Sequence, residues 1–154
     1  MGGSTCSKEL YNDTRLMAGK LAARGVVILC GGGSGIMEAA ARGASESGGL
    51  TLGILPGSSA GQTPPNRWIQ IPIYTGLSDA RNAVNVRSSQ AILAVGGSYG
   101  TLSEIALALK IGKPVVTYKT WDLPPPPTGD RGPLHAAGNP DEAVRLLLDL
   151  VEME

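Results

Sequence analysis

The sequence predicts an α/β protein built on a doubly wound parallel sheet with helices on both faces. Short apolar runs alternate with helix-like segments along the chain, as in sheets made of β-α-β units. Two of these runs lead directly into a glycine-rich turn and then a helix. The 154 residues suffice for one domain with a sizeable core, so we expect residues 1–154 to form a single domain.

The first half of the chain is expected to form a helix followed by a β-α-β unit. Ser7 suits the N-cap position of the first helix, and Gly25 lies just past its end. The spacing between the two apolar runs suits a right-handed crossover. The expected elements are a helix over residues 8–23, a strand over 26–30, a helix over 36–47 and a strand over 50–55.

The start of the sheet is unusual, because a doubly wound sheet normally begins with a strand. Only Met1 precedes the turn-like Gly2-Gly3-Ser4-Thr5 segment. We therefore expect the usual first strand to be lacking, so that either this start is internal or the sheet differs near its centre.

The second half continues the alternation. Residues 57–66 are small, polar or proline and predict a mobile loop. Pro72 favours an edge position for its strand, and Ser78 and Asn139 are the expected N-caps of the next and last helices. The expected strands are 68–74, 90–95 and 115–118, of which 115–118 is the last. The expected helices are 79–88, a helix from the glycine-rich turn at 96–100 to about residue 110, and a helix from Pro140. Residues 124–139 are expected to lack regular structure.

Composition narrows the classes of partner. Thirteen basic residues balance thirteen acidic ones, so we expect neither nucleic acid nor a membrane surface as a partner. Phe is absent and glycine reaches 22 residues, which indicates an aliphatic core crossed by tight turns. Cys6 and Cys30 provide neither a disulfide framework nor a metal-ligand spacing. The sequence has no signal-like or membrane-length apolar run, and the expected location is the cytoplasm.

The two glycine turns, Gly31–Gly35 and Gly96–Gly100, are the candidate ligand site. Each stands at the carboxyl end of a strand and opens a helix, where free N–H groups and the helix dipole favour an anion. Either turn alone also suits a tight connection that binds nothing. Together, on one sheet edge and bearing Ser or Thr, they predict a phosphate site. Neither turn has the P-loop pattern, and the first lacks the dinucleotide-binding spacing.

Arg81 and Glu104 are the candidates for chemistry at this edge. Arg81 lies early in a helix and suits a phosphate or ribose, although a solvated helix face is the alternative. Glu104 near a helix N-terminus either complements the dipole or, beside a sugar, stabilises an oxocarbenium-like centre or activates water. His135 is expected on the surface, and Cys30 is expected to pack in the core.

The segment Gly96–Glu104 resembles the PGGxGTxxE motif of the LONELY GUY (LOG) family, long labelled "possible lysine decarboxylase". Cys30–Glu38, Gly48–Pro56 and Ala94–Leu109 resemble the branch of that superfamily containing the molybdenum cofactor carrier proteins. The resemblance implies a Rossmann-like fold, a homo-oligomer (dimer or tetramer) and a phosphorylated, nucleotide-like ligand. That ligand would be an AMP-like nucleotide or the molybdenum cofactor, with no cofactor required and no metal site.

LOG enzymes remove the base from a nucleoside 5′-monophosphate with a glutamate and an upstream arginine, which Glu104 and Arg81 match. Gly96, Ser98 and Asn82 stand where that family has Pro, Gly and Lys, and these departures favour binding over hydrolysis. No lysine lies in a pyridoxal-phosphate context, so lysine decarboxylation is not expected. Besides catalytic Arg81 and Glu104, the predicted ligand-binding residues are Gly32, Gly33, Ser34, Gly35, Asn82, Gly97, Ser98, Tyr99, Gly100 and Thr101.

Three hypotheses follow. The first is a binding protein for a phosphorylated nucleotide or pterin-type ligand. The second is a LOG-type phosphoribohydrolase that uses Glu104 and Arg81. The third is a structural role in which the site is empty.

Overall fold

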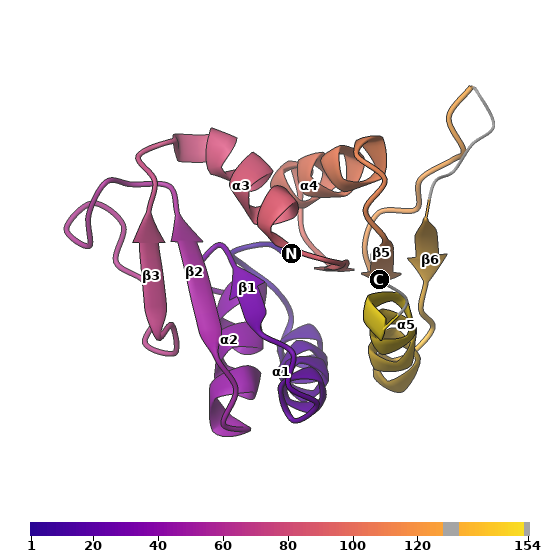
Figure 1. Cartoon of the computed structure of the whole chain (residues 1–154), viewed down its shortest axis with the longest axis horizontal. Coiled ribbons are helices and arrows are strands. Elements are labelled where there is room, and N and C mark those ends of the chain that lie inside the picture. Colours follow the sequence, from indigo (N-terminus) through magenta and orange to yellow (C-terminus); the bar gives the residue numbers. More distant parts are fainter. Residues whose placement is uncertain (128–132, 153–154) are drawn as a thin grey trace.

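The computed structural model describes residues 1–127 and 133–152, which form a parallel α/β fold (Figure 1). The strands are β1 (Ile28–Cys30), β2 (Thr51–Leu55), β3 (Ile71–Tyr74), β4 (Ile92–Val95), β5 (Val115–Tyr118) and β6 (Leu134–Ala136). The helices are α1 (Lys8–Ala22), α2 (Ile36–Glu46), α3 (Arg81–Ser88), α4 (Tyr99–Lys110), α5 (Pro140–Glu152) and the short 3-10 helix η1 (Ser78–Ala80).

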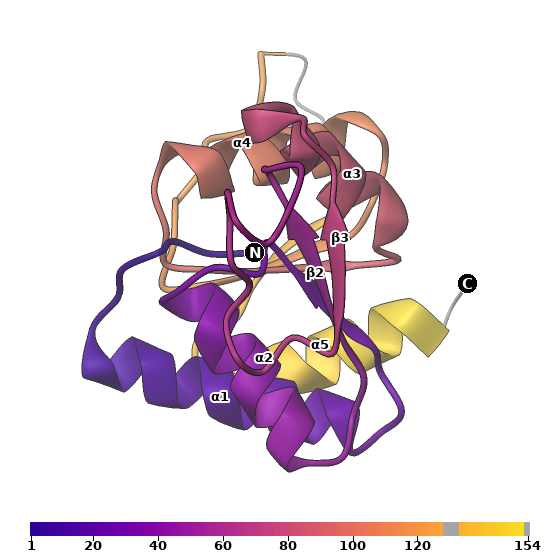
Figure 2. The same cartoon turned by 90° about the vertical axis from the view of Figure 1, so that its left-hand side faces the viewer.

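Helices cover both faces of the strands, as the sequence predicts. Figure 2 shows α1, α2 and α5 on one side of the strands and α3 and α4 on the other. All strand pairs are parallel. The strands form two three-stranded sheets, in the orders β1-β2-β3 and β4-β5-β6. The predicted Rossmann-like class is therefore confirmed, with a break at the centre of the sheet.

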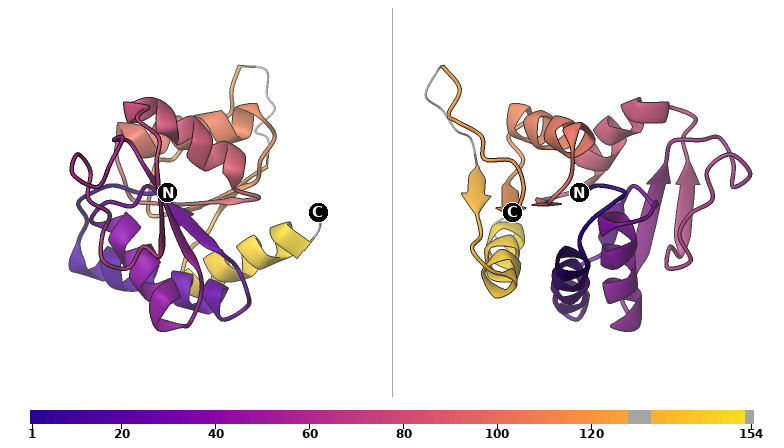
Figure 3. Two further views of the ribbon diagram at one scale, coloured as in Figure 1. Left: turned by 60° about the vertical axis from the view of Figure 1, so that its left-hand side comes forward. Right: turned by 180° about the vertical axis from the view of Figure 1, so that it is seen from behind.

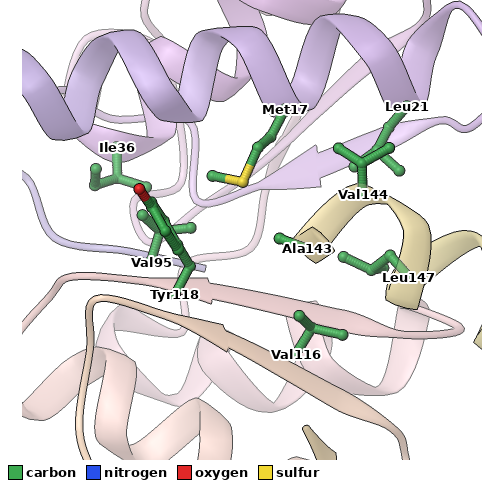
Figure 4. Packing of buried hydrophobic residues seen from close by; sticks show 9 residues of the cluster. All are labelled: Met17, Leu21, Ile36, Val95, Val116, Tyr118, Ala143, Val144 and Leu147. Atoms are coloured by element: carbon green, nitrogen blue, oxygen red, sulfur yellow. The ribbon is translucent and has the colours of Figure 1, made fainter. Parts of the chain in front are cut away.

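Two apolar clusters lie on opposite faces of the second sheet. Side chains alternate along a strand, so Val115 packs on the α3 and α4 side while Val116 and Tyr118 pack on the other. The cluster that contains Val116 and Tyr118 joins α1, α5 and β5 across the break between the sheets (Figure 4). Its buried members are Met17, Leu21, Ile36, Val95, Val116, Tyr118, Ala143, Val144 and Leu147.

Several local predictions are confirmed by side-chain caps. The Ser7 hydroxyl accepts a hydrogen bond from the Leu10 N–H at 3.1 Å and begins α1. Asn139 Oδ1 accepts from the Glu142 N–H at 2.9 Å at the start of α5. β3 lies at the edge of its sheet, which suits Pro72 because proline provides no N–H for a further strand.

Two predictions are wrong. Ser78 is not an N-cap: it has a φ of 50° and lies inside η1, and α3 begins only at Arg81. The strand over 115–118 is not the last, because β6 pairs with β5 through Val115↔Leu134 and Thr117↔Ala136. Part of the expected irregular connection over 124–139 is thus a strand, and residues 128–132 of it lie outside the described residues.

The start of the chain lies at the break between the sheets. The Val95 N–H donates to the Met1 carbonyl oxygen at 2.9 Å, and Gly2 forms a parallel bridge with Val95. Met1 and Gly2 therefore continue the sheet beside β4. Among the described residues, no strand lies between β1 and β4. The expected difference near the centre of the sheet is this gap between β1 and β4.

Candidate functional site

The first glycine turn, Gly31–Gly35, is shaped by contacts within the protein. Gly32 and Gly35 have positive φ angles of 77° and 64°, which favour glycine. A Cβ on Gly35 would lie 2.5 Å from the carbonyl carbon of Ser4, and the Ser34 hydroxyl donates to the Ser4 carbonyl oxygen at 2.9 Å. The hydroxyl hydrogen of Ser34 is therefore committed to the protein itself.

Asn66 joins the loop over residues 57–66 to this turn. Its side-chain amide donates to the Gly33 carbonyl oxygen at 2.8 Å, and its backbone N–H donates to the Gly32 carbonyl oxygen at 2.8 Å. These bonds use two carbonyl groups of the turn, and so the loop helps to fix the turn's shape. Asn66 is not predicted as a site residue from the sequence, because a lone Asn before Arg67 resembles many loop residues.

Arg81 begins α3 and extends its guanidinium group over the first turn. A Cβ on Gly31 would lie 2.1 Å from Nη1 of Arg81, so only glycine leaves room for this side chain. The Arg81 Nε is buried and has no hydrogen-bond partner among the described residues. A buried, unpaired donor on a charged group is costly. An anionic group at this position would satisfy it, since guanidinium binds phosphate and carboxylate well.

Glu104 lies on α4 and is buried, with 5% of its surface exposed. The fully buried Asn85 of α3 donates from Nδ2 to Glu104 Oε1 at 2.9 Å. This bond orients the carboxylate from the neighbouring helix. Asn85 Oδ1 is buried and lacks a partner among the described residues. Asn85 is not predicted as a site residue from the sequence, although its position four residues after Arg81 places both on one face of α3.

Cys30 is the last residue of β1 and is buried. Its Sγ accepts from the Gly32 N–H at 3.4 Å and donates to the Met37 carbonyl oxygen at 3.6 Å. Burial raises the pKa of the Cys30 thiol above its ordinary value; the Gly32 N–H and nearby Arg81 lower it, and nearby Glu104 raises it. Arg81 and Glu104 therefore both lie close enough to influence one thiol, and Cys30 is a buried packing residue as expected.

The second glycine turn, Gly96–Gly100, is more open. Gly97 has a φ of 92°, and a Cβ there would lie 2.1 Å from Oγ1 of the buried Thr101. By contrast, a Cβ on Gly100 would meet nothing within 4 Å. The Ser98 side chain is exposed and makes no capping bond to α4. The helix N-terminus and the Ser98 hydroxyl are therefore accessible to a ligand.

Two further contacts hold this turn from the side. Asn82 Nδ2 donates to the Ser103 hydroxyl at 3.2 Å, and that hydroxyl donates to the Gly100 carbonyl oxygen at 2.7 Å. Trp121 Nε1 donates to the Ser98 carbonyl oxygen at 3.1 Å. The centroid of the Trp121 ring lies 5.6 Å from that of the Tyr99 ring. Asn82 thus supports the turn through Ser103, while Tyr99 lies at the surface with 78% exposure.

The remaining candidates lie outside this region. His135 is in β6 rather than in a loop, and it is half-buried. Residues 1–127 and 133–152 contain no group of three or more His, Cys, Asp or Glu side chains placed to hold a metal ion. Over the same residues, no helix combines the length and apolar character needed to cross a bilayer.

The fold and these two turns define a Rossmann-like α/β protein whose polar groups gather at the carboxyl ends of β1 and β4. The chain belongs to the SLOG cluster4 family, whose model matches residues 1–144. An uncharacterized protein of Archaeoglobus fulgidus is 40% identical over 144 residues, which are 94% of this chain and 89% of that protein.

Two named relatives confirm the resemblance drawn from the glycine motifs. A probable cytokinin riboside 5′-monophosphate phosphoribohydrolase LOGL9 of rice, Oryza sativa subsp. japonica, is 33% identical over 106 residues, 68% of this chain and 47% of that protein. The chain thus spans about half the length of that relative. The structure of the Moco carrier protein from Chlamydomonas reinhardtii superposes with a TM-score of 0.84 at 33% identity, covering 100% of this chain and 94% of that one.

Proposed function

We propose that this protein binds a phosphorylated, nucleotide-like ligand at the carboxyl ends of β1 and β4. The observation that carries this proposal is the unpaired Arg81 Nε, buried beside the first glycine turn. The open N-terminus of α4 supplies a second group of donors. Both groups favour an anion, so a phosphorylated ligand would engage them.

The ligand class is supported by the relatives. The rice relative is named for a nucleoside 5′-monophosphate substrate, and the Chlamydomonas structure is that of a molybdenum cofactor carrier. Both ligands are small and phosphorylated. The molybdenum cofactor would here be a bound cargo, with its phosphate paired to Arg81 and the amide groups of a turn. We propose the wider class, which includes AMP-like nucleotides and phosphorylated pterins.

Calorimetric titration with AMP, adenosine and inorganic phosphate tests the phosphate requirement. We expect AMP to bind at least about tenfold more tightly than adenosine, a difference of about 1.4 kcal/mol. Arg81→Ala should remove that difference, whereas Arg87→Ala, a matched change of an exposed arginine at the other end of α3, should preserve it. Equal affinity for AMP and adenosine, or failure of AMP, phosphate and a phosphorylated pterin to raise the melting temperature, would contradict the proposal.

A second candidate function is hydrolysis of the N-glycosidic bond of a nucleoside 5′-monophosphate. The specific observation is the buried Glu104 carboxylate, oriented by a hydrogen bond from Asn85. In this reaction, water adds to C1′ of the ribose, the bond from C1′ to the base breaks, and the base leaves with a proton. Glu104 would take the proton from water or stabilise positive charge at C1′, and Arg81 would hold the phosphate.

Incubation with AMP distinguishes the two functions. Release of adenine that is lost in Glu104→Gln, while AMP affinity persists, would establish the hydrolase. Tight AMP binding with no adenine above the rate of a protein-free blank would leave the carrier as the function. A Glu142→Gln variant, changed at a half-buried carboxylate on α5, is the matched control for both measurements.

A further inference from the structure

Two aromatic rings lie together at the protein surface beside the second glycine turn. Tyr99, the first residue of α4, is 78% exposed, more than any other large hydrophobic side chain of the described residues. Its ring centroid lies 5.6 Å from that of Trp121, with an angle of 37° between the two ring planes. A single exposed apolar side chain needs no explanation, but a pair of large rings at the surface is typical of a contact site.

Trp121 is fixed in place by the segment that follows β5. The Gly96 N–H donates to the Tyr118 carbonyl oxygen at 3.2 Å. The Thr120 hydroxyl donates to the Gly96 carbonyl oxygen, and the indole N–H of Trp121 donates to the Ser98 carbonyl oxygen. Figure 3 shows this segment on the same side of the strands as α3 and α4. Because all these bonds are internal to the protein, the ring needs no ordering when a ligand binds.

These bonds also decide which backbone groups of the turn remain for a ligand. The carbonyl oxygens of Gly96, Ser98 and Gly100 each accept a hydrogen bond from a side chain. By contrast, the N–H groups of Ser98, Tyr99 and Gly100 have no hydrogen-bond partner among the described residues. Consecutive free N–H groups at a helix N-terminus favour an anion. The aromatic pair therefore adjoins a group of donors suited to phosphate.

The start of α3 connects this surface to the rest of the candidate site. Asn82 follows Arg81 and donates to the Ser103 hydroxyl at 3.2 Å, and that hydroxyl donates to the Gly100 carbonyl oxygen at 2.7 Å. The buried, unpaired Arg81 Nε thus belongs to the residue next to one that supports the second turn. The aromatic pair, the second turn and the start of α3 are therefore neighbouring parts of one region.

We propose that Tyr99 and Trp121 bind the planar heteroaromatic ring of the ligand, which stacks on Tyr99 while its phosphate accepts from the N-terminus of α4. This placement rests on the proposed function, because it assigns a position to the other half of the same ligand. Aromatic side chains bind many heterocycles by stacking, since every such ring has a π face. Affinity should therefore follow ring area, with bicyclic purines and pterins above pyrimidines, and pyrimidines above a ligand that has no ring.

The neighbouring donors favour a ring-bearing ligand over an apolar protein surface as the occupant. An apolar partner that covered Tyr99 would also bury the free N–H groups of the turn, and buried unpaired donors are costly. A ligand with both a ring and a phosphate covers the aromatic pair and satisfies these donors together. Tyr99 contributes to both contacts, through its side chain and through its backbone N–H.

Titration calorimetry with AMP, UMP and ribose 5-phosphate tests the ring contact, because the three compounds share the sugar and the phosphate. The measured quantity is the dissociation constant of ribose 5-phosphate divided by that of AMP. We expect a ratio of at least about ten in the parent protein, with UMP between the two. Tyr99→Ala and Trp121→Ala should lower this ratio to less than about three, whereas Tyr99→Phe should preserve it. Trp68→Ala, a change of an aromatic residue that contacts Thr51 at the amino end of β2, is the matched control.

Proton NMR separates stacking from an indirect effect on the turn. The ring current of a stacked Tyr99 should shift the H2 and H8 resonances of bound AMP upfield, and the shift should decrease in Tyr99→Ala. A structural role of Tyr99 in the turn would leave these ligand resonances unshifted in the parent protein, and that result would overturn the ring contact.

A high ratio that falls in Tyr99→Ala and Trp121→Ala but not in Trp68→Ala would support the proposal. Equal affinities for AMP and ribose 5-phosphate in the parent protein would overturn the ring contact and leave the phosphate site standing. Failure of both compounds to bind would overturn the proposed function, and the ring contact with it. An equal loss of both affinities in Tyr99→Ala would also overturn the ring contact, because Tyr99 would then act on the turn alone.

Discussion

The two glycine turns have related sequences, Gly-Gly-Gly-Ser-Gly and Gly-Gly-Ser-Tyr-Gly, but different groups surround them. Other segments of the protein occupy the space around the first turn. Ser4 packs on Gly35, Asn66 donates hydrogen bonds to two carbonyl groups of the turn, and Arg81 covers Gly31. In the second turn, Ser98 is exposed and Gly100 has open space before it. The same motif thus serves in one place to position an arginine and in the other to present free donors.

The largest contrast should appear in stability. Gly35→Val requires a positive φ and a Cβ within 2.6 Å of the Gly3 carbonyl oxygen, so we expect it to cost about 3 kcal/mol or more. Gly100→Val enters open space within α4 and should change the free energy of unfolding by less than about 1 kcal/mol. Urea denaturation of both variants measures the difference. Equal losses would mean that the second turn is as tightly packed as the first.

The order of the two variants should reverse in binding. Gly100→Val places a branched side chain where a ligand would approach the N-terminus of α4, and we expect AMP affinity to fall at least about tenfold, or 1.4 kcal/mol. Titration calorimetry measures this, with circular dichroism to verify the fold. Lys110→Ala at the opposite end of α4 is the control. Unchanged AMP affinity in Gly100→Val would contradict a ligand site at the second turn.

A pair of serine variants gives a smaller contrast. Ser34→Ala removes the bond to the Ser4 carbonyl oxygen, and we expect a loss of about 1 kcal/mol in the free energy of unfolding. Ser98→Ala removes no side-chain hydrogen bond within residues 1–127 and 133–152 and should leave the free energy of unfolding within about 0.5 kcal/mol. Its AMP affinity should fall a few-fold instead. Thermal denaturation measures the stability of both variants, and titration calorimetry measures their AMP affinity. Weaker AMP binding in Ser34→Ala alone would contradict a ligand site at the second turn.

The last contrast is a pH dependence at the first turn, expected only above pH 9. Because burial raises the pKa of Cys30 above its ordinary value of 9.0, the unfolded chain loses the thiol proton first as the pH rises. The free energy of unfolding should therefore fall above pH 9, by at most about 1.4 kcal/mol per pH unit. Denaturation at pH 8 and pH 10 in a Cys6→Ser background measures it. In Cys30→Ala, the free energy of unfolding should fall less between pH 8 and pH 10 than in the parent protein. An equal fall in both would assign the pH dependence to other groups.

The sequence predicts elements well where local signals agree. Ser7 and Asn139 are capping residues at the starts of amphipathic helices, and the predicted caps are present. By contrast, β6 holds only Leu134–Ala136, and it is a strand because β5 offers its edge. Such pairing is tertiary, and no local pattern reports it. Ser78 has the residue type of a cap but a left-handed backbone, which the type alone does not reveal.

The places of several candidate site residues in the fold were predictable in outline. Glycine turns, Arg81 and Glu104 have sequence signals of their own, and the fold brings them to the ends of β1 and β4. Asn85 and Asn66 were missed because their importance depends on what they contact, the Glu104 carboxylate and the Gly33 carbonyl group. The difference between the two turns was also beyond the sequence, since it depends on segments as distant as Ser4 and Arg81.

The bond from Trp121 to the Ser98 carbonyl oxygen gives the second turn its own optical reporter. Indole fluorescence depends on the polarity and hydrogen bonding around the ring, and this ring touches both Tyr99 and the turn. The other tryptophan, Trp68, lies beside the guanidinium groups of Arg42 and Arg67. In a Trp68→Phe background, fluorescence from Trp121 would report ligand binding at the second turn in real time, without any attached dye.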